Sequence, residues 1–108
     1  MATTKPNLKM DLNALTQRVA GLAESHGGKV GSKIKFSFED GSHILLDDSV
    51  SPATVSNDDS SADCTVRVSL ENFSKLLDGE MNAMGAYMMG RLKIDGDMGV
   101  AMKLANLF

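Results

Sequence analysis

The apolar residues of this chain change their spacing between residues 22 and 30, and that change limits the fold more than any other feature. Up to residue 22 they recur every three or four positions, as on one face of a helix: Leu8, Leu12, Leu15, Val19 and Leu22. From residue 30 they alternate with polar residues, as in a strand with one face in water: Val30, Ile34, Phe36 and Phe38. The pair Gly27-Gly28 separates the two patterns and predicts the end of the helix.

Three further strands are expected after the first. Asp40-Gly41 predicts a hairpin turn, with the return strand over residues 42–48. A third short strand is expected over residues 50–55, where Pro52 indicates a sheet edge or a bulge. Alternation over residues 64–70 predicts the fourth strand.

Short helices and one more strand complete the chain. A helix is expected from a Ser69 cap to Gly79, and a shorter one over residues 81–90. Residues 91–95 predict a fifth strand, and Asp97 is placed to cap a last helix. The inward face of that helix is expected to hold Met98, Ala101, Met102 and Ala105, joined by Leu104, Leu107 and Phe108. This order predicts an α+β fold with a mostly antiparallel five-stranded sheet and helices packed on one face.

The length of 108 residues fits one domain without an internal repeat, with residues 1–6 as a loose start. The formal net charge of −3 excludes a generally basic nucleic-acid binder. No apolar run reaches the ~20 residues of a membrane-spanning helix, and no secretory leader is visible. One cysteine forms no internal disulfide. We therefore expect a cytoplasmic protein.

Catalytic motifs are scarce, and we expect no enzyme, no metal and no cofactor. The two histidines, His26 and His43, share no motif with Cys64, whose apolar strand position indicates a buried thiol. His26 is interpreted as a solvated residue in the last turn of the first helix. Phosphate-binding, nucleophile-elbow and paired-histidine motifs are missing, and four zinc ligands cannot be gathered. The acidic turn over residues 56–63 lacks the glycine and terminal glutamate of an EF-hand loop.

Methionine is the most unusual part of the composition, with eight residues against one tyrosine and no tryptophan. Six of the eight lie between residues 81 and 102. They form either an ordinary core or the lining of a cavity, because an unbranched thioether repacks around ligands of different shape. A copper(I) site is a third interpretation, and it needs a chain exposed to copper. The periodicity leaves core and cavity both open.

Several motifs occur together in residues 62–108. They are Ala62-Asp63-Cys64-Thr65-Val66, then Phe73 with Leu76 and Gly79, then residues 86–97 (AYMMGRLKIDGD), and finally Ala101-Met102-Lys103-Leu104 with Leu107-Phe108. An aromatic residue after an alanine, then G-K/R-L-K-I-x-G-D/N and a terminal A-x-x-L helix, resembles the sterol carrier protein type 2 family. The N-terminal helix and hairpin fit the same fold, so the resemblance spans nearly the whole chain.

This resemblance implies an apolar tunnel between the sheet and the helices. It also implies non-catalytic binding or transfer of a fatty acid, fatty acyl-CoA, phospholipid, sterol or similar apolar ligand. The short helices around residues 81–89 and the terminal helix would form the gate. The residues expected to bind the lipid are Phe73, Leu77, Met81, Met84, Tyr87, Met88, Met98, Met102 and Phe108.

Two departures from the family pattern bear on ligand and location. Many members carry a proline just before the alanine-aromatic pair, where this chain has Met81-Asn82-Ala83-Met84-Gly85, which leaves the ligand position open. The end of the chain, Asn106-Leu107-Phe108, differs from the Ser-Lys-Leu peroxisomal address. We therefore expect a bacterial cytoplasmic protein, for which sterol is not the expected natural ligand.

Two further kinds of partner are considered. The domain is similar to accessory proteins of bacterial ubiquinone synthesis, which implies an alternative role as a scaffold that presents a hydrophobic intermediate to partner enzymes. Lys29, Lys33 and Lys35 form a small basic cluster. A solvated sheet face explains this cluster, and transient contact with anionic membrane headgroups is the alternative.

Overall fold

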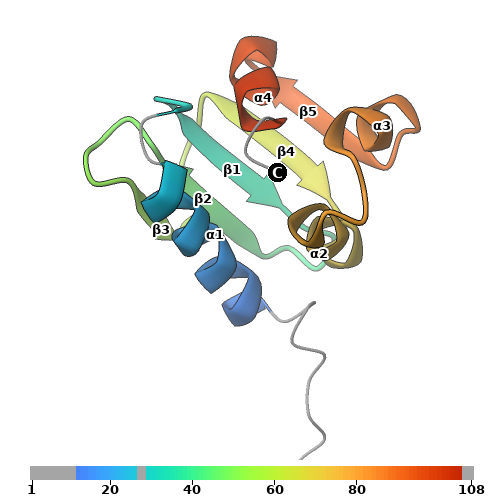
Figure 1. Ribbon diagram of the computed structural model, residues 1–108, viewed down its shortest axis with the longest axis horizontal. Helices are drawn as coiled ribbons and strands as arrows, with labels where there is room; N and C mark the ends of the chain where they lie inside the picture. The colour runs from blue at the N-terminus through green and yellow to red at the C-terminus, as the bar shows by residue number, and fades with distance from the viewer. Residues whose placement is uncertain (1–11, 27–28, 106–108) are drawn as a thin grey trace, which may run out of the picture.

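The computed structural model describes residues 12–26 and 29–105, and its elements follow the predicted order (Figure 1). The elements are α1 (Leu12–His26), β1 (Lys33–Ser37), β2 (His43–Asp47), β3 (Thr54–Ser56), β4 (Cys64–Val68), α2 (Leu70–Asp78), α3 (Ala83–Met88), β5 (Leu92–Gly96) and α4 (Met98–Ala105). No helix within the described ranges is long and apolar enough to cross a membrane. The side chain of His26 and the residues Leu8, Leu107 and Phe108 lie outside what the structure describes.

The five strands form one sheet in the order β3-β2-β1-β4-β5. Three of the four neighbouring pairs are antiparallel, and β1 pairs with β4 in parallel. The prediction of a mostly antiparallel sheet is therefore confirmed, with one parallel pair that it did not locate. That pair arises because the chain leaves β3 at the edge and crosses two strands before it enters β4.

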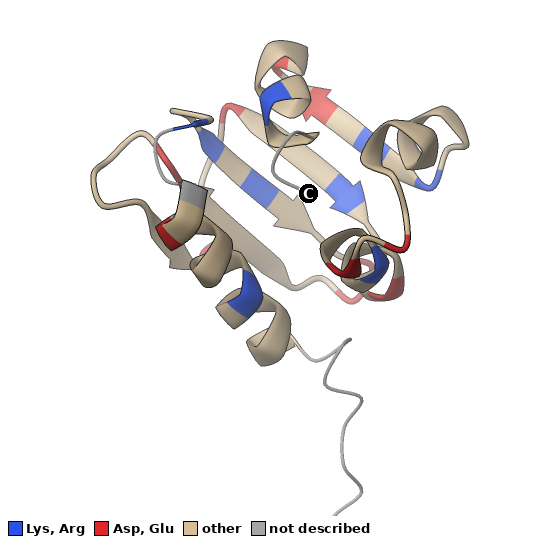
Figure 2. Cartoon of the chain, viewed as in Figure 1, with Lys and Arg blue, Asp and Glu red and all other residues tan. Residues whose placement is uncertain are grey.

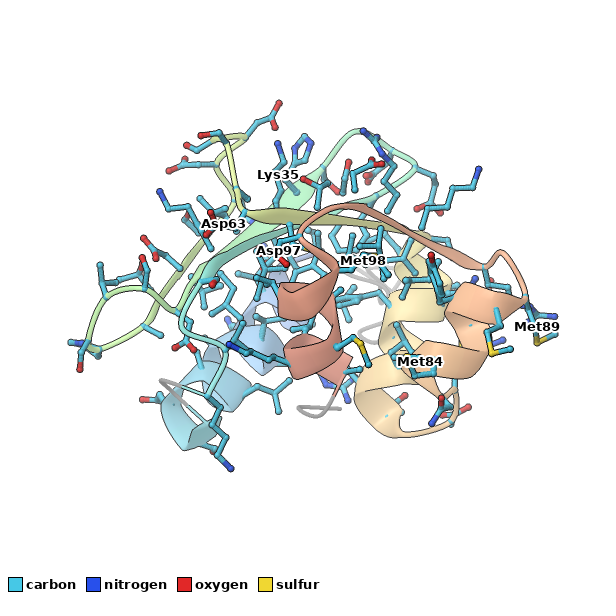
Figure 3. The ribbon with its side chains drawn as sticks, turned by 90° about the horizontal axis from the view of Figure 1, so that it is seen from above. Lys35, Asp63, Met84, Met89, Asp97 and Met98 are labelled. Atoms are coloured by element: carbon cyan, nitrogen blue, oxygen red, sulfur yellow. The ribbon has the colours of Figure 1, made fainter. Side chains whose placement is uncertain are left out.

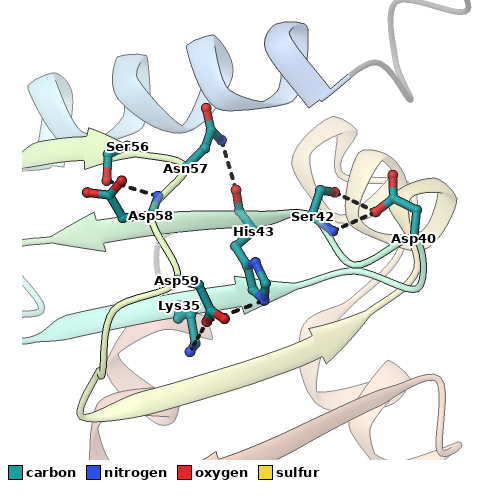
Figure 4. A network of polar contacts seen from close by, with 8 residues as sticks. All are labelled: Lys35, Asp40, Ser42, His43, Ser56, Asn57, Asp58 and Asp59. Atoms are coloured by element: carbon teal, nitrogen blue, oxygen red, sulfur yellow. Dashed lines mark hydrogen bonds and ion pairs between the residues drawn. The ribbon is translucent and has the colours of Figure 1, made fainter.

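The connection from β3 to β4 crosses the face of the sheet that carries no helices, and polar contacts hold it there (Figure 4). The carboxylate of Asp59 accepts from Lys35 Nζ at 2.7 Å and lies 3.5 Å from His43 Nε2. The Asn57 amide donates to the carbonyl of His43 at 2.8 Å. Leu45 shares this face and is buried, although its strand neighbours there are polar. Lys35 of the basic cluster therefore already has an acidic partner.

The apolar side of the sheet is covered by all four helices (Figure 3). Even-numbered residues of β1 and β2 point toward the helices, as the alternation predicts. At the centre, the ring of Phe73 from α2 lies 4.7 Å from that of Phe36 and 5.3 Å from that of Phe38. These contacts fix α2 against the sheet through its buried phenylalanine.

Local turn and cap predictions are confirmed. The turn at Asp40-Gly41 closes the β1–β2 hairpin, with Gly41 at a φ of +87° and its N–H bonded to the carbonyl of Phe38. Ser69 Oγ accepts from Asn72 N at 3.0 Å at the start of α2. Asp97 Oδ1 accepts from Gly99 N at 2.8 Å at the start of α4. Short-range sequence signals therefore locate these boundaries well.

The third strand is an edge strand, as Pro52 indicated, but it begins later, at Thr54. Proline has no N–H to donate to the neighbouring strand, so the ladder with β2 starts only beyond it. Asp47 pairs with Thr54 at this end of the ladder.

The predicted inward face of α4 is wrong for its two methionines. Val100, Ala101 and Leu104 are buried, whereas Met98 and Met102 are exposed. Ala101 and Leu104 belong to both sets, and Val100 was not predicted. The branched residues Val100 and Leu104 are buried in the core, and the two methionines therefore face outward.

Candidate functional site

A partly open apolar space lies between the sheet, α3 and α4, and we call it the apolar recess. Its floor comes from β1, β4 and β5, and its walls come from α2, α3 and α4. The lining residues are Phe36, Val66, Leu76, Ala83, Met84, Tyr87, Leu92, Ile94, Leu104 and Ala105. Every lining side chain is apolar or aromatic, so the recess suits a hydrocarbon chain.

The recess is small in this structure, with a volume of about 30 Å³. That is room for about one or two water-sized groups, whereas pockets for small organic ligands typically hold roughly 300–1,000 Å³. The tunnel expected from the family resemblance is therefore not seen among the described residues. A lipid chain would need the walls of the recess to move apart.

The floor and the α2 wall are firmly held. Phe73 and Leu76 of α2 are buried in the core. Gly79 ends the helix at a φ of +77°, and its N–H bonds to the carbonyl of Leu76. An ion pair of 2.6 Å between Arg18 and Asp78 joins α1 to α2. This side of the recess offers no simple route to expansion.

The walls made by α3 and α4 are held less firmly. α3 has six residues, with Ala86 as its buried residue, and Gly85 lies inside it. Glycine within a helix lowers stability by roughly 0.5–1 kcal/mol relative to alanine. Short helices depend on packing for their stability, and Met84 and Tyr87 of α3 are both exposed in part. α3 is therefore the wall that can be displaced at least cost, and α4 beside it buries three residues but exposes Met98 and Met102.

The nine residues predicted to bind lipid fall into three groups. Met84 and Tyr87 line the recess. Phe73 is fully buried beside it, and Leu77 and Met81 are half-buried against the core. None of these three lines the recess. Met88, Met98 and Met102 are exposed and do not line it either, and Phe108 lies outside the described residues.

Sequence reasoning missed most of the lining. Phe36, Val66 and Ile94 come from three different strands. Their alternation marked them as inward-facing, which is the signal that could have found them. It did not show that α3 and α4 leave a gap above them.

A larger depression of about 590 Å³ lies between the end of α1 and the β2–β3 connection. It opens widely to solvent, and Glu24, Asp48 and Ser49 are among its lining residues. The Asp48 carboxylate already accepts from Val30 N at 3.0 Å and Gly31 N at 2.8 Å. That carboxylate holds the chain in place before β1, so we assign this depression no ligand.

Nucleophilic chemistry finds no support in the placement of Cys64 and His43. Cys64 is buried on the helix side of the sheet, and burial followed by the nearby carboxylates of Asp97, Asp95 and Asp63 raises the pKa of its thiol. His43 points to the opposite face, toward Asp59. The sheet separates the two side chains, and the prediction of a buried thiol is confirmed.

The chain is a small α+β domain with an apolar recess between its sheet and its helices. The family model described as the SCP-2 sterol transfer family matches residues 11–108, and the chain belongs to this family. Sterol carrier protein 2 of Homo sapiens is 49% identical over 51 residues, which are 47% of this chain and 9% of the human protein. The chain thus matches a small part of a much longer relative.

Solved structures share the fold at low sequence identity. The solution structure of palmitated SCP2L2 from Aedes aegypti has a TM-score of 0.64 and 20% identity, covering 95% of this chain and 94% of that one. The ubiquinone synthesis protein UbiJ-SCP2 has a TM-score of 0.60 and 22% identity, covering 89% of this chain and 80% of that one. These likenesses confirm the five-stranded α+β fold.

Proposed function

We propose that this protein binds a lipid with a long acyl chain, without chemical change, in an enlarged form of the apolar recess. A fatty acid, a fatty acyl-CoA or a phospholipid would supply such a chain. The observation that carries the proposal is the recess itself, because it has a wholly apolar lining and two short helices as movable walls. The palmitate in the Aedes aegypti relative supports a fatty acyl ligand.

The energy of binding would come from the removal of hydrocarbon from water. Each buried methylene contributes roughly 0.8 kcal/mol before the costs of binding are counted. Displacement of α3 and α4 lowers that gain, since buried residues of these helices, such as Ala86 and Leu104, would lose part of their packing in the core. A long chain therefore binds more tightly than a short one, and the affinity should rise with chain length.

Met84 provides a direct test, because it lines the recess and is still 46% exposed. Met84→Glu places a charge at the recess with little effect on the core. Val50→Glu is the matched control, because Val50 is also 46% exposed but lies in the connection between β2 and β3. Native mass spectrometry with added oleate would measure binding to the wild type and both variants.

The wild type and Val50→Glu should bind oleate equally, and Met84→Glu should bind about tenfold less tightly, the change that ~1.4 kcal/mol produces. Equal binding by Met84→Glu and the wild type would contradict the assignment of the recess. No oleate uptake by the wild type, together with recovery of biosynthetic enzymes in a pull-down, would favour the scaffold role instead.

A further inference from the structure

Exposed large apolar side chains are concentrated on one part of the molecule. Seven are exposed among the described residues, and Val50 is the one outside the segment from α3 to α4. The other six, which we call the methionine face, are Met84, Tyr87, Met88, Met89, Met98 and Met102. Exposed apolar side chains that gather on neighbouring elements mark an interaction surface, whereas isolated ones are ordinary.

The outer part of the methionine face serves neither the core nor the apolar recess. Met88 is 81% exposed, Met89 is 69% exposed and Met102 is 57% exposed, and none of them lines the recess. Figure 3 shows Met84 and Met98 between α4 and α3, with Met89 at the outer end of α3. The face therefore extends outward from the helices that would have to move to admit a lipid.

The cations and the acids of the segment from α3 to α4 differ in whether they have partners. Its cations, Arg91, Lys93 and Lys103, are exposed and have no ion pair within the described ranges. Its two acids are engaged: Asp95 accepts from Arg67 Nε at 2.7 Å, and Asp97 caps α4. Figure 2 shows basic positions along α4, β5 and the turn before β5.

One cation adjoins the methionine face directly. Arg91 borders the same surface depression as Met89, beside Lys75 and Glu80. Lys75 has an acidic partner, Glu71, at 3.5 Å. Lys103 follows Met102 in α4 and is exposed with it. Apolar side chains and unneutralised cations therefore occur together at both ends of the face.

This combination favours an anionic bilayer over a second copy of the chain. A two-fold interface places one patch against itself, so Arg91 and Lys103 would approach like charges. Anionic headgroups would neutralise these cations, and flexible methionines would enter the acyl boundary. We propose that the methionine face docks on an anionic phospholipid bilayer, so that α3 and α4 open toward the acyl chains. This inference rests on the proposed function, which supplies the lipid that is exchanged.

Flotation with vesicles of phosphatidylcholine containing about one quarter phosphatidylglycerol tests the docking surface. Met89→Glu is the main variant, because Met89 lies outside the recess and is mostly exposed. Val50→Glu is again the control. A double variant, Arg91→Gln with Lys103→Gln, tests the role of charge. Oleate binding without vesicles is measured in parallel for each protein.

The wild type and Val50→Glu should float with these vesicles, and Met89→Glu should float about tenfold less while it binds oleate normally. The double variant should lose most of the dependence on phosphatidylglycerol. Equal flotation of Met89→Glu and the wild type would overturn the inference, as would oleate binding without flotation of the wild type. A dimer in light scattering that Met89→Glu disperses, without flotation, would assign the face to a second copy and also overturn it. Flotation that depends on Met89 without oleate uptake would support docking and contradict the proposed function.

Discussion

The two walls of the apolar recess are built from different residues. On the α2 side, the ring of Phe73 packs at a tilt against Phe36 of β1 and against Phe38 just after it, and a serine and a glycine cap the helix. On the side of α3 and α4, short helices contain Gly85 and Gly99 and expose methionines. Both walls cover the same sheet (Figure 3). Under the proposed function, ligand space would be created by movement of the α3 and α4 wall while the α2 wall stays in place.

The largest expected effect lies in the fixed wall. Phe73→Ala removes a fully buried ring and should lower the free energy of unfolding by about 3–5 kcal/mol. Met88→Ala, in the movable wall, should change it by less than about 0.5 kcal/mol, because Met88 is exposed. Urea unfolding monitored by circular dichroism measures both values. Similar losses of unfolding free energy in the two variants would contradict the distinction between a fixed and a movable wall.

A smaller but clear loss is expected where β5 approaches the start of β4. Gly96 has a φ of +104°, and a Cβ atom there would lie 2.5 Å from the carbonyl oxygen of Asp63. Gly96→Ala should therefore cost about 1–3 kcal/mol of stability. The same urea titration tests this value. An unchanged free energy of unfolding would mean that the backbone at the β4–β5 junction adjusts as easily as α3.

A substitution in α3 should raise the free energy of unfolding instead of lowering it. A Cβ atom at Gly85 would meet the Asn82 side chain at 3.8 Å, an ordinary contact. Gly85→Ala should therefore stabilise the protein by about 0.4–1 kcal/mol and slow the uptake of oleate, because the movable wall is stiffer. Stopped-flow displacement of a fluorescent fatty acid measures the rate. Unchanged uptake in a stabilised variant would show that α3 does not control entry.

The smallest effect concerns the face of the sheet away from both walls. The side-chain hydrogen bond from Lys35, followed by the charges of His43 and Lys35, lowers the pKa of Asp59. A carboxyl whose pKa is lower in the folded state stabilises the protein above its unfolded pKa, and this contribution is lost as the pH falls through the folded pKa. Asp59→Asn should therefore flatten the acid limb of the pH–stability curve slightly and leave oleate binding unchanged. An altered oleate affinity would link this face to the recess.

Local chemistry made much of the fold predictable. The turn at Asp40-Gly41 and the caps at Ser69 and Asp97 depend on residues close in sequence, and all three were located correctly. The parallel pairing of β1 with β4 depends on contacts across the sheet, such as Asp59 with Lys35, which no local pattern contains.

The site was less predictable than the fold for a related reason. In α4 both sides carry apolar residues, so periodicity alone could not choose between Met102 and Leu104 as the buried one. Alternation in the strands showed that Phe36 and Ile94 face inward, but not that a gap lies above them. The periodicity of apolar residues predicts which side chains are buried, but it does not predict which of them contact one another.

Hydrogen exchange of the protein with and without oleate tests the central claim most directly. Amides of α3 and α4 should exchange rapidly without ligand and become protected with it. Amides of β4 and α2 should exchange slowly in both states. Slow, ligand-independent exchange in α3 and α4, or protection confined to α1 and the depression beside it, would contradict a recess that opens through its α3 and α4 wall.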